Sequence, residues 1–226
     1  MGYFVRQADL KTDFENIQAL WSRNAHAVTA SRYSWMYGAN PAGPSWAWLA
    51  TTQVGEVIGC AGLASRLMKI GSQFARVGQA IDLMVDAPHR TVGPAMQLQR
   101  AVTASSKEFA IPLIYAFPNA RSEGILQRAG YRVLGRLEQW TKPLRSAYKI
   151  RDYIRSDVGV KAAAFIVDAV LRFASPEWRH RTPTGIRAAM LQTFDERFDD
   201  LWDRASRQFS LIGDRSAAYL QWRFGR

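Results

Sequence analysis

The positions of hydrophobic and polar residues predict that helices and strands alternate over the first part of the chain. Apolar residues three and four apart predict an amphipathic helix over residues 9–24. Three later apolar runs are separated by glycine-containing turns, and they predict three strands joined as antiparallel hairpins. The expected elements, in chain order, are a strand at 3–6, a helix at 9–24, strands at 46–52, 57–68 and 74–85, a helix at 93–109, a strand at 111–117, a helix at 122–130 and one or two strands within 131–140. This order predicts a mixed domain of the α/β (α+β) class.

The pattern changes after Pro143. An apolar helix is expected at 158–174, a linker at 176–183 and an amphipathic helix at 194–205. We therefore expect a first domain over residues 1–145 and a mainly helical extension over 146–226. The apolar helix at 158–174 is expected to pack on its own domain or on a further lobe; docking on a membrane or a partner's groove is the alternative.

The end of the chain resembles an earlier passage. Leu20-Trp21 and Trp35 are echoed by Leu201-Trp202 and Trp222, each within an aromatic, amphipathic stretch. Chance similarity between two such helices explains the match equally well. If the repeat is real, the extension is the start of a truncated second lobe.

Composition and charge narrow the class of protein. The chain has 226 residues, a hydrophobic fraction of 48% and a formal net charge of +11, most of which lies in the first 150 residues. Such a charge favours anionic partners. Nucleic acid is not expected, because no long basic run and no zinc-finger spacing occur. A single cysteine, Cys60, fits a reducing compartment, and no signal pattern or membrane-length apolar run is found, so a cytoplasmic protein without a transmembrane segment is expected.

The segment from Asp82 to Ala95 carries the strongest motif. It reads as an apolar strand that enters a tight turn and opens into a helix, with Arg90, Gly93 and Ala95 spaced R-x-x-G-x-A. A helix start presents unpaired backbone N–H groups at the positive end of the helix dipole. Small residues let a ligand approach the backbone closely, and the arginine adds a cation. The pattern therefore predicts a site for an anion such as a pyrophosphate.

The element order, the R-x-x-G-x-A turn and the later Asn119…Gly130-Tyr131 segment together resemble the GNAT superfamily of N-acyltransferases, over about residues 3–145. The resemblance implies a GNAT fold, with a mostly antiparallel central sheet flanked by helices, and a turn whose amides bind the pyrophosphate of coenzyme A. Segments such as DLMVD…HR and GPAMQLQRA look closest to GNAT-like proteins of bacterial exopolysaccharide or cell-envelope gene sets. The cofactor-binding residues that the resemblance implies are Met84, Val85, Arg90, Thr91, Val92, Gly93, Ala95 and Asn119.

In that family an amine attacks the thioester of acyl-CoA directly. The resemblance places the backbone amides that stabilise the oxyanion near Met84 and Val85. Asp82 is the candidate general base, because it lies in an otherwise apolar stretch of the same strand. Its alternative role is to cap a turn or to pair with an arginine. For Asn119, the alternative to a cofactor contact is a plain turn residue.

Two positions depart from the family pattern. Many members place a tyrosine, as general acid, four residues before the glycine of the terminal Gly-aromatic pair, and here that position is Leu126. The acid is therefore absent or replaced, for example by Tyr115 or Tyr131. Pro94 removes one backbone donor from the anion-binding turn, although proline is tolerated in the first turn of a helix. No metal site is expected, because the histidines show no ligand spacing and Cys60 is expected in the core.

The resemblance implies three alternative functions. The first is an N-acyltransferase that moves an acetyl or other acyl group from acyl-CoA to a small primary amine, such as an amino sugar or an amino acid. The second uses an acyl carrier protein as donor and predicts a long apolar tunnel, with little effect of Arg90→Ala on coenzyme A binding. The third is a non-catalytic GNAT-like binding or scaffold lobe, motivated by Leu126. A homodimer is left open.

Overall fold

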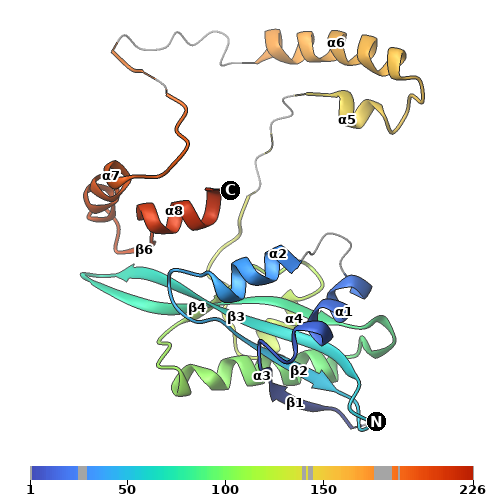
Figure 1. The fold of residues 1–226 in the computed structure, drawn as a ribbon, viewed down its shortest axis with the longest axis vertical. Coiled ribbons are helices and arrows are strands. Elements are labelled where there is room, and N and C mark those ends of the chain that lie inside the picture. The colour runs from blue at the N-terminus through green and yellow to red at the C-terminus, as the bar shows by residue number, and fades with distance from the viewer. Residues whose placement is uncertain are drawn as a thin grey trace. The chain divides into compact units, whose positions relative to one another are not determined.

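The computed structural model describes residues 2–24, 30–138, 141, 145–175, 185–187 and 189–225, and for Val92 only the backbone is described. The chain divides into two units: Met1–Val133 together with Leu191–Arg226, and Leu134–Met190. Each is described by itself below (Figure 1). The division expected near residue 145 stays a prediction.

A single twisted sheet forms the centre of the larger unit. Its strands run in the order β1-β2-β3-β4-β5, with β6 paired to β3 outside this path. All pairs are antiparallel except β4 with β5, so the predicted mixed, mostly antiparallel sheet is confirmed. The strands are β1 (Phe4–Gln7), β2 (Trp46–Thr51), β3 (Val57–Ile70), β4 (Gln73–Val85), β5 (Ile114–Ala116) and β6 (Leu211–Gly213).

Helices cover both faces of this sheet (Figure 1). On one face, α1 (Phe14–Asn24), α2 (Ala30–Tyr33) and the π-helical turn η1 (Ser34–Gly38) bury aromatic and aliphatic side chains against β2 and β3. On the other face, α3 (Val92–Glu108) packs Leu98 and Val102 against the remaining core. The period-2 alternation of β2 and β3 explains both layers, since neighbouring residues Trp48 and Leu49 face opposite helices.

A β-bulge interrupts β4 at Asp82. Ile81 pairs with Gly62 and Met84 pairs with Cys60, so two residues of β4 lie opposite Ala61 alone. The extra residue is Asp82, which has a φ of 52°. Because the bulge consumes one residue, Ile81 and Met84 both face α1 and α2, although they are three positions apart.

Two expectations about local structure are wrong. Tyr131 to Glu138 belongs to no strand among the described residues, and residues 139 and 140 lie outside them. An extended segment becomes a strand only where a sheet edge accepts it, and the apolar pattern alone does not supply that edge. Ser122 precedes α4 (Glu123–Arg128), as expected, but its side chain makes no capping bond to that helix. The predicted linker at 176–183 lies outside the described residues.

The C-terminal segment belongs to the larger unit. It consists of α7 (Glu196–Ser206), the short strand β6, which was not predicted, and α8 (Ala217–Phe224). It is joined to α2 and η1 by a pair of tryptophans: Trp35 Nε1 donates to the Trp222 carbonyl at 2.7 Å, and Trp222 Nε1 donates to the Trp35 carbonyl at 3.0 Å. Their rings are stacked with centroids 4.7 Å apart. The two stretches of the suspected repeat thus touch through equivalent tryptophans, while the duplication itself stays a prediction.

The smaller unit contains α5 (Ala147–Ile150) and α6 (Asp157–Ala174). The Ser146 amide donates to the Asp168 carboxylate at 2.7 Å and so joins the start of α5 to α6. The helix expected at 158–174 is therefore confirmed, with Val160 and Ala164 buried. Within the described ranges of the chain, no helix combines the length and the apolar character needed to cross a membrane.

Candidate functional site

The strands β4 and β5 separate where the predicted site begins. They pair only at Gly78–Ala80 and Ile114–Ala116. Beyond Ala80 and Ala116 a pocket of about 220 Å³ opens between them. It is lined by Ala80, Ile81, Asp82, Leu83, Gln99, Ala116, Phe117, Pro118, Asn119, Ser122 and Leu126. Because Ile81 packs toward α1 and Ala80 toward the α3 side, this opening reaches both faces of the sheet.

The start of α3 lies directly after β4. Thr91 is the residue before the helix, with extended backbone and no side-chain capping bond. Helix geometry leaves the N–H groups of Val92 and Gly93 without an acceptor inside the helix, while Pro94 has none to offer. A Cβ built at Gly93 meets only the Thr91 hydroxyl, at 3.8 Å, so the space above this glycine is open. These two amides and the helix dipole can hold an anion.

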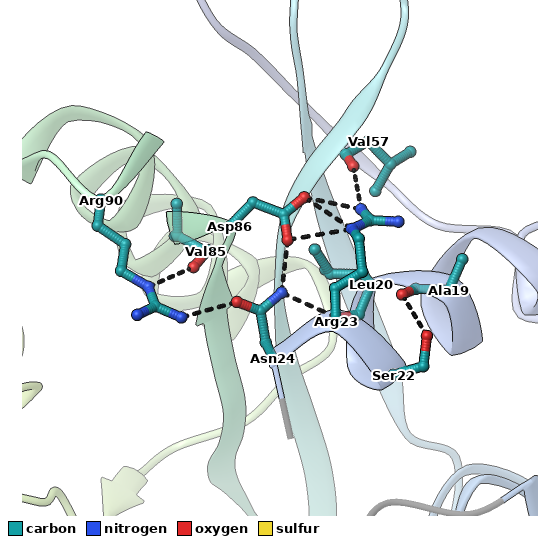
Figure 2. Close-up of polar contacts among 9 residues, drawn as sticks. All are labelled: Ala19, Leu20, Ser22, Arg23, Asn24, Val57, Val85, Asp86 and Arg90. Atoms are coloured by element: carbon teal, nitrogen blue, oxygen red, sulfur yellow. Dashed lines mark hydrogen bonds and ion pairs between the residues drawn. The ribbon is translucent and has the colours of Figure 1, made fainter. Parts of the chain in front are cut away.

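Arg90 joins the turn after β4 to the ends of β4 and α1 by hydrogen bonds (Figure 2). Its Nε donates to the Val85 carbonyl at 3.0 Å, and its Nη2 donates to Asn24 Oδ1 at 2.8 Å. The predicted phosphate-binding cation is therefore already engaged with the end of β4 and the end of α1. A contact from Arg90 to a phosphate stays a prediction.

Asp86 continues the same network toward α1. Its carboxylate accepts from Arg23 at 2.7 Å and from the Asn24 side chain at 2.5 Å, and Arg23 also donates to the Val57 carbonyl (Figure 2). Burial alone raises the pKa of Asp86, but the hydrogen bonds from Arg23 and Asn24 outweigh burial and leave that pKa below its usual range. Asp86 is thereby kept as a carboxylate that positions the turn.

Asp82 lies in the bulge and lines the pocket. Its side chain is only 10% exposed, and Arg32 binds both of its oxygens, at 2.7 and 3.1 Å. The Tyr37 hydroxyl donates a third bond at 2.9 Å. The alternative role, pairing with an arginine, is what the structure shows for Asp82 in this state. Its service as a general base stays a prediction, since a proton would have to enter this network.

Val85 and Met84 flank the oxyanion position that the family resemblance implies. The amide of Asp86 donates to the Ile58 carbonyl on β3. By strand alternation, the N–H and C=O of Val85 point to the other edge of β4, toward the opening. Met84 pairs with Cys60 and packs toward α1. Ala95 packs between α3 and the sheet core, which explains why a small residue is needed there.

Asn119 forms a compact turn at the opposite side of the pocket. Its Oδ1 accepts from the amides of Arg121 and Ser122, at 3.0 and 3.1 Å, so it acts as a turn residue that starts α4. It also lines the pocket, as does Leu126. Leu126 is buried and supplies no proton, as its side chain dictates.

The two tyrosines considered as replacements for the acid differ in their surroundings. The Tyr115 hydroxyl donates to Gln79 Oε1 at 3.2 Å. The Tyr131 hydroxyl is buried and finds no hydrogen-bond partner among the described residues. Burial raises the pKa of Tyr131 to about 12, so it keeps its proton at neutral pH. Cys60 is buried, as expected of a core residue. Burial raises the pKa of its thiol to about 12, so the thiol stays protonated at neutral pH.

Sequence reasoning missed Arg32, Tyr37 and Asn24. Each lies far along the chain from the residue that it binds, so local spacing could not reveal the pairs. The signal that the sequence offers is the aromatic run around Tyr37, which supplies a hydrogen-bond donor to Asp82. In the part of the chain that the structure describes, no three histidine, cysteine or acidic side chains gather as metal ligands.

Comparison with known proteins extends the description of the fold. No protein-family model and no curated protein matches this chain. Among solved structures, the aminoglycoside 6'-N-acetyltransferase AAC(6')-Ih from Acinetobacter baumannii is similar, with 18% identity, a TM-score of 0.50 and coverage of 63% of this chain and 99% of that one. AAC(6')-Iy in complex with a CoA-S-monomethyl-acetylneamine bisubstrate analogue has 18% identity, a TM-score of 0.51 and the same coverage.

A second structure of AAC(6')-Iy, in complex with CoA, is also similar at 18% identity and a TM-score of 0.51, over 62% of this chain and 95% of that one. At this level of identity the likeness concerns the fold. The chain therefore has the fold of the GNAT acetyltransferases.

Proposed function

We propose that the protein transfers an acetyl or other acyl group from acyl-CoA to a primary amine. The observation that carries the proposal is the opening between β4 and β5, which is lined by Gln99 of α3, the helix whose open first turn follows β4 along the chain. The first turn of α3 thus offers an anion site for a pyrophosphate, and the pocket between β4 and β5 offers space into which the thioester end of acyl-CoA can extend. The similar structures that contain CoA or a CoA bisubstrate analogue support this assignment.

The reaction needs three things from the chain. The amides of Val92 and Gly93 would hold the pyrophosphate. The amine nitrogen attacks the thioester carbonyl carbon, and the Val85 N–H at the free edge of β4 would stabilise the oxyanion. The C–S bond then breaks, the thiolate of coenzyme A leaves, and the proton lost by the amine passes to a base. Asp82 is our candidate for that base, with Arg32 and Tyr37 setting its position.

The test is acetyl-CoA binding by titration calorimetry in the parent protein and in Gly93→Asp. An aspartate in the first turn of a helix does not harm the helix, yet it repels a pyrophosphate. We expect the parent to bind and Gly93→Asp to lose at least about tenfold in affinity, or about 1.4 kcal/mol. Gly124→Asp is the matched control, because Gly124 also lies in the first turn of a helix, with open space around it. No binding to the parent at millimolar acetyl-CoA contradicts the proposal.

Two observations favour a second candidate, a non-catalytic binding lobe. Leu126 occupies the position of the usual acid, and the Asp82 carboxylate is already engaged by three hydrogen bonds. Turnover of acetyl-CoA with a broad panel of amines separates the two candidates. Activity that Asp82→Asn abolishes supports the enzyme, and CoA binding without any turnover supports the binding lobe.

The donor form with an acyl carrier protein stays a further proposal. This donor predicts that Arg90→Ala changes coenzyme A binding little. That variant does not separate the two donors, because Arg90 already donates hydrogen bonds to Val85 and Asn24. Gly93→Asp is the sharper variant for the same question, since it acts on the anion site directly.

A further inference from the structure

Arg66 is a buried cation that the proposed reaction does not use. It lies in β3, is 7% exposed, and its guanidinium carbon is 3.3 Å from the centre of the Tyr219 ring. Its Nη2 donates to the Asp214 carbonyl at 2.7 Å. Its Nη1 is buried without a hydrogen-bond partner, and no carboxylate of the described residues forms an ion pair with it. An arginine buried in this way is costly unless an anion completes its environment.

A second arginine converges on the same point. Arg215 lies 5.7 Å from the centre of the same Tyr219 ring and donates to the same Asp214 carbonyl at 3.3 Å. The Asp214 carboxylate accepts from the amide and the hydroxyl of Ser216 and forms no ion pair with Arg66, although its charge acts on that guanidinium. Burial lowers the pKa of Arg66, and although interactions with Tyr219, Tyr115 and Asp214 oppose this shift, the pKa ends below its usual value. Two cations thus share one neutral acceptor.

This pair of arginines lies on the face of the sheet where Asp82 opens into the pocket. Gly62 on β3 faces Tyr37, and alternation along the strand puts Arg66 on that same face. Arg66 pairs with Val77 on β4, five residues from Asp82, so the two positions are about 16 Å apart along the strand. Gln79 and Tyr115 lie between them, hydrogen-bonded to each other, and Tyr115 directly precedes the pocket residue Ala116.

We propose that Arg66 and Arg215 bind an anionic oxygen group, a carboxylate or a phosphate, at the far end of the acyl acceptor, whose amine lies in the opening beside Asp82. This inference rests on the proposed function and names the substrate class: long amines with an anionic terminus. An arginine fork suits such a group because it donates two parallel hydrogen bonds. Because Arg66 Nη1 is buried, binding of the anion would require the turn Asp214–Ser216, which carries Arg215, to move.

The decisive experiment compares acceptors that differ only in their terminus. Unbranched ω-amino carboxylates, from aminobutanoate to aminododecanoate, are measured beside the ω-amino alcohols of equal length, with acetyl-CoA as donor. We expect kcat/KM to favour the carboxylate by about tenfold or more at an intermediate length that spans roughly 10 to 16 Å. Short chains, which cannot reach Arg66, show no preference. ω-Aminooctyl phosphate beside ω-aminooctanoate decides between phosphate and carboxylate.

The variants assign that preference to Arg66. Arg66→Met and Arg215→Gln are expected to remove it, and Arg66→Lys, which keeps the charge but not the fork, is expected to weaken it. Arg76→Met is the matched control, because Arg76 is an exposed arginine on β4 whose side chain extends toward Trp46 and Gly43. A preference that persists in both Arg66→Met and Arg215→Gln, or no preference at any length, overturns the proposal.

A second readout keeps this inference separate from the proposed function. ω-Aminooctanoate is expected to raise the melting temperature of the parent and of Arg76→Met, but not of Arg66→Met, whereas ω-aminooctanol raises none of them. If acetyl-CoA fails to bind and this Arg66-dependent shift remains, the proposed function is wrong and the anion site stands. If amines are acetylated without any preference and no shift occurs, the anion site is wrong and the proposed function stands.

Discussion

Two arginines on the same face of the sheet have opposite electrostatic surroundings. Burial lowers the pKa of Arg32, but the hydrogen bonds and charge of Asp82 outweigh burial, and the pKa ends above its usual value. Arg66 is buried too, and with no comparable carboxylate its pKa ends below its usual value. The first arginine is therefore satisfied by the fold, whereas the second has a donor to spare. Burial of a charge thus indicates a binding site only where the fold leaves that charge uncompensated.

The largest change in stability is expected when the ion pair between Asp82 and Arg32 is broken. Asp82→Asn keeps the shape of the side chain and tolerates the φ of 52°, but it leaves Arg32 without its carboxylate. Because the Arg32 side chain is 29% exposed, we expect a loss at the low end for buried pairs, about 2 to 3 kcal/mol in the free energy of unfolding by urea.

A double variant tests the cause of that loss. Adding Arg32→Met to Asp82→Asn is expected to recover at least about 1 kcal/mol, because the unpaired charge is then gone. Losses that simply add in the double variant would show that the ion pair is not the source.

Alkaline pH probes the same cluster through Cys60, whose Sγ donates to the Asp82 carbonyl. Its pKa rises from 9.0 to about 12 through burial first and the charge of Asp82 second. A raised pKa in the fold means that stability is complete below pH 9 and falls as pH rises toward 12, by up to about 1.4 kcal/mol per pH unit.

Unfolding measured from pH 8 to pH 11 checks this expectation. Cys60→Ala should show a flatter decline than the parent, while the buried Tyr131, with a pKa of about 12, contributes only above pH 10. Equal declines in the parent and in Cys60→Ala would exclude Cys60 as the titrating group.

Asn24→Ala is expected to have an intermediate effect on stability, through the network around Asp86. It removes the amide that links Asp86 to Arg90, but Arg23 still pairs with Asp86 and is itself 46% exposed. We expect a loss of about 1 kcal/mol, measured by urea unfolding, together with weaker acetyl-CoA binding because the turn before α3 is less well held. Full acetyl-CoA affinity in this variant would mean that Arg90 needs no anchor to position the turn.

The smallest effect on stability is expected at Arg66. Replacing a buried, uncompensated charge by a side chain of similar length removes a desolvation cost along with one hydrogen bond and the contact with Tyr219. In buffer without organic anions, we therefore expect the free energy of unfolding of Arg66→Met, measured with urea, to lie within about 1 kcal/mol of the parent's. A loss as large as that of Asp82→Asn would place Arg66 among the structural residues and end the contrast between the two arginines.

The elements that carry the fold could be predicted because their patterns are local. The helix near Trp21, the strand run ending at Val85 and the turn at Gly93 each show their period or spacing within a short stretch. The bulge at Asp82 could not be placed, since nothing in the spacing shows a positive φ. The short strand β6 escaped prediction because its stability comes from pairing with β3, far away in sequence.

The candidate site was predictable only where its residues follow one another in one segment of the chain. Gly93 lies in the first turn of α3, directly after β4, as its spacing predicts, whereas the partners of Asp82 come from α2 and η1. Asp82 is a charged residue within an apolar strand and belongs to a segment with a motif. Arg66, between Ser65 and Leu67 in β3, is also charged, but no motif surrounds it and so no local pattern predicts a role for it.

The reciprocal tryptophan pair gives this molecule a built-in optical reporter. Trp35 and Trp222 are 187 positions apart, and their stacked indoles, with centroids 4.7 Å apart, are close enough for their electronic transitions to couple. Such coupling produces a paired positive and negative band in circular dichroism that neither indole gives alone. Since contacts this distant in sequence require closure of a long loop, that signal would appear late during refolding and would time the docking of the C-terminal segment without any added label.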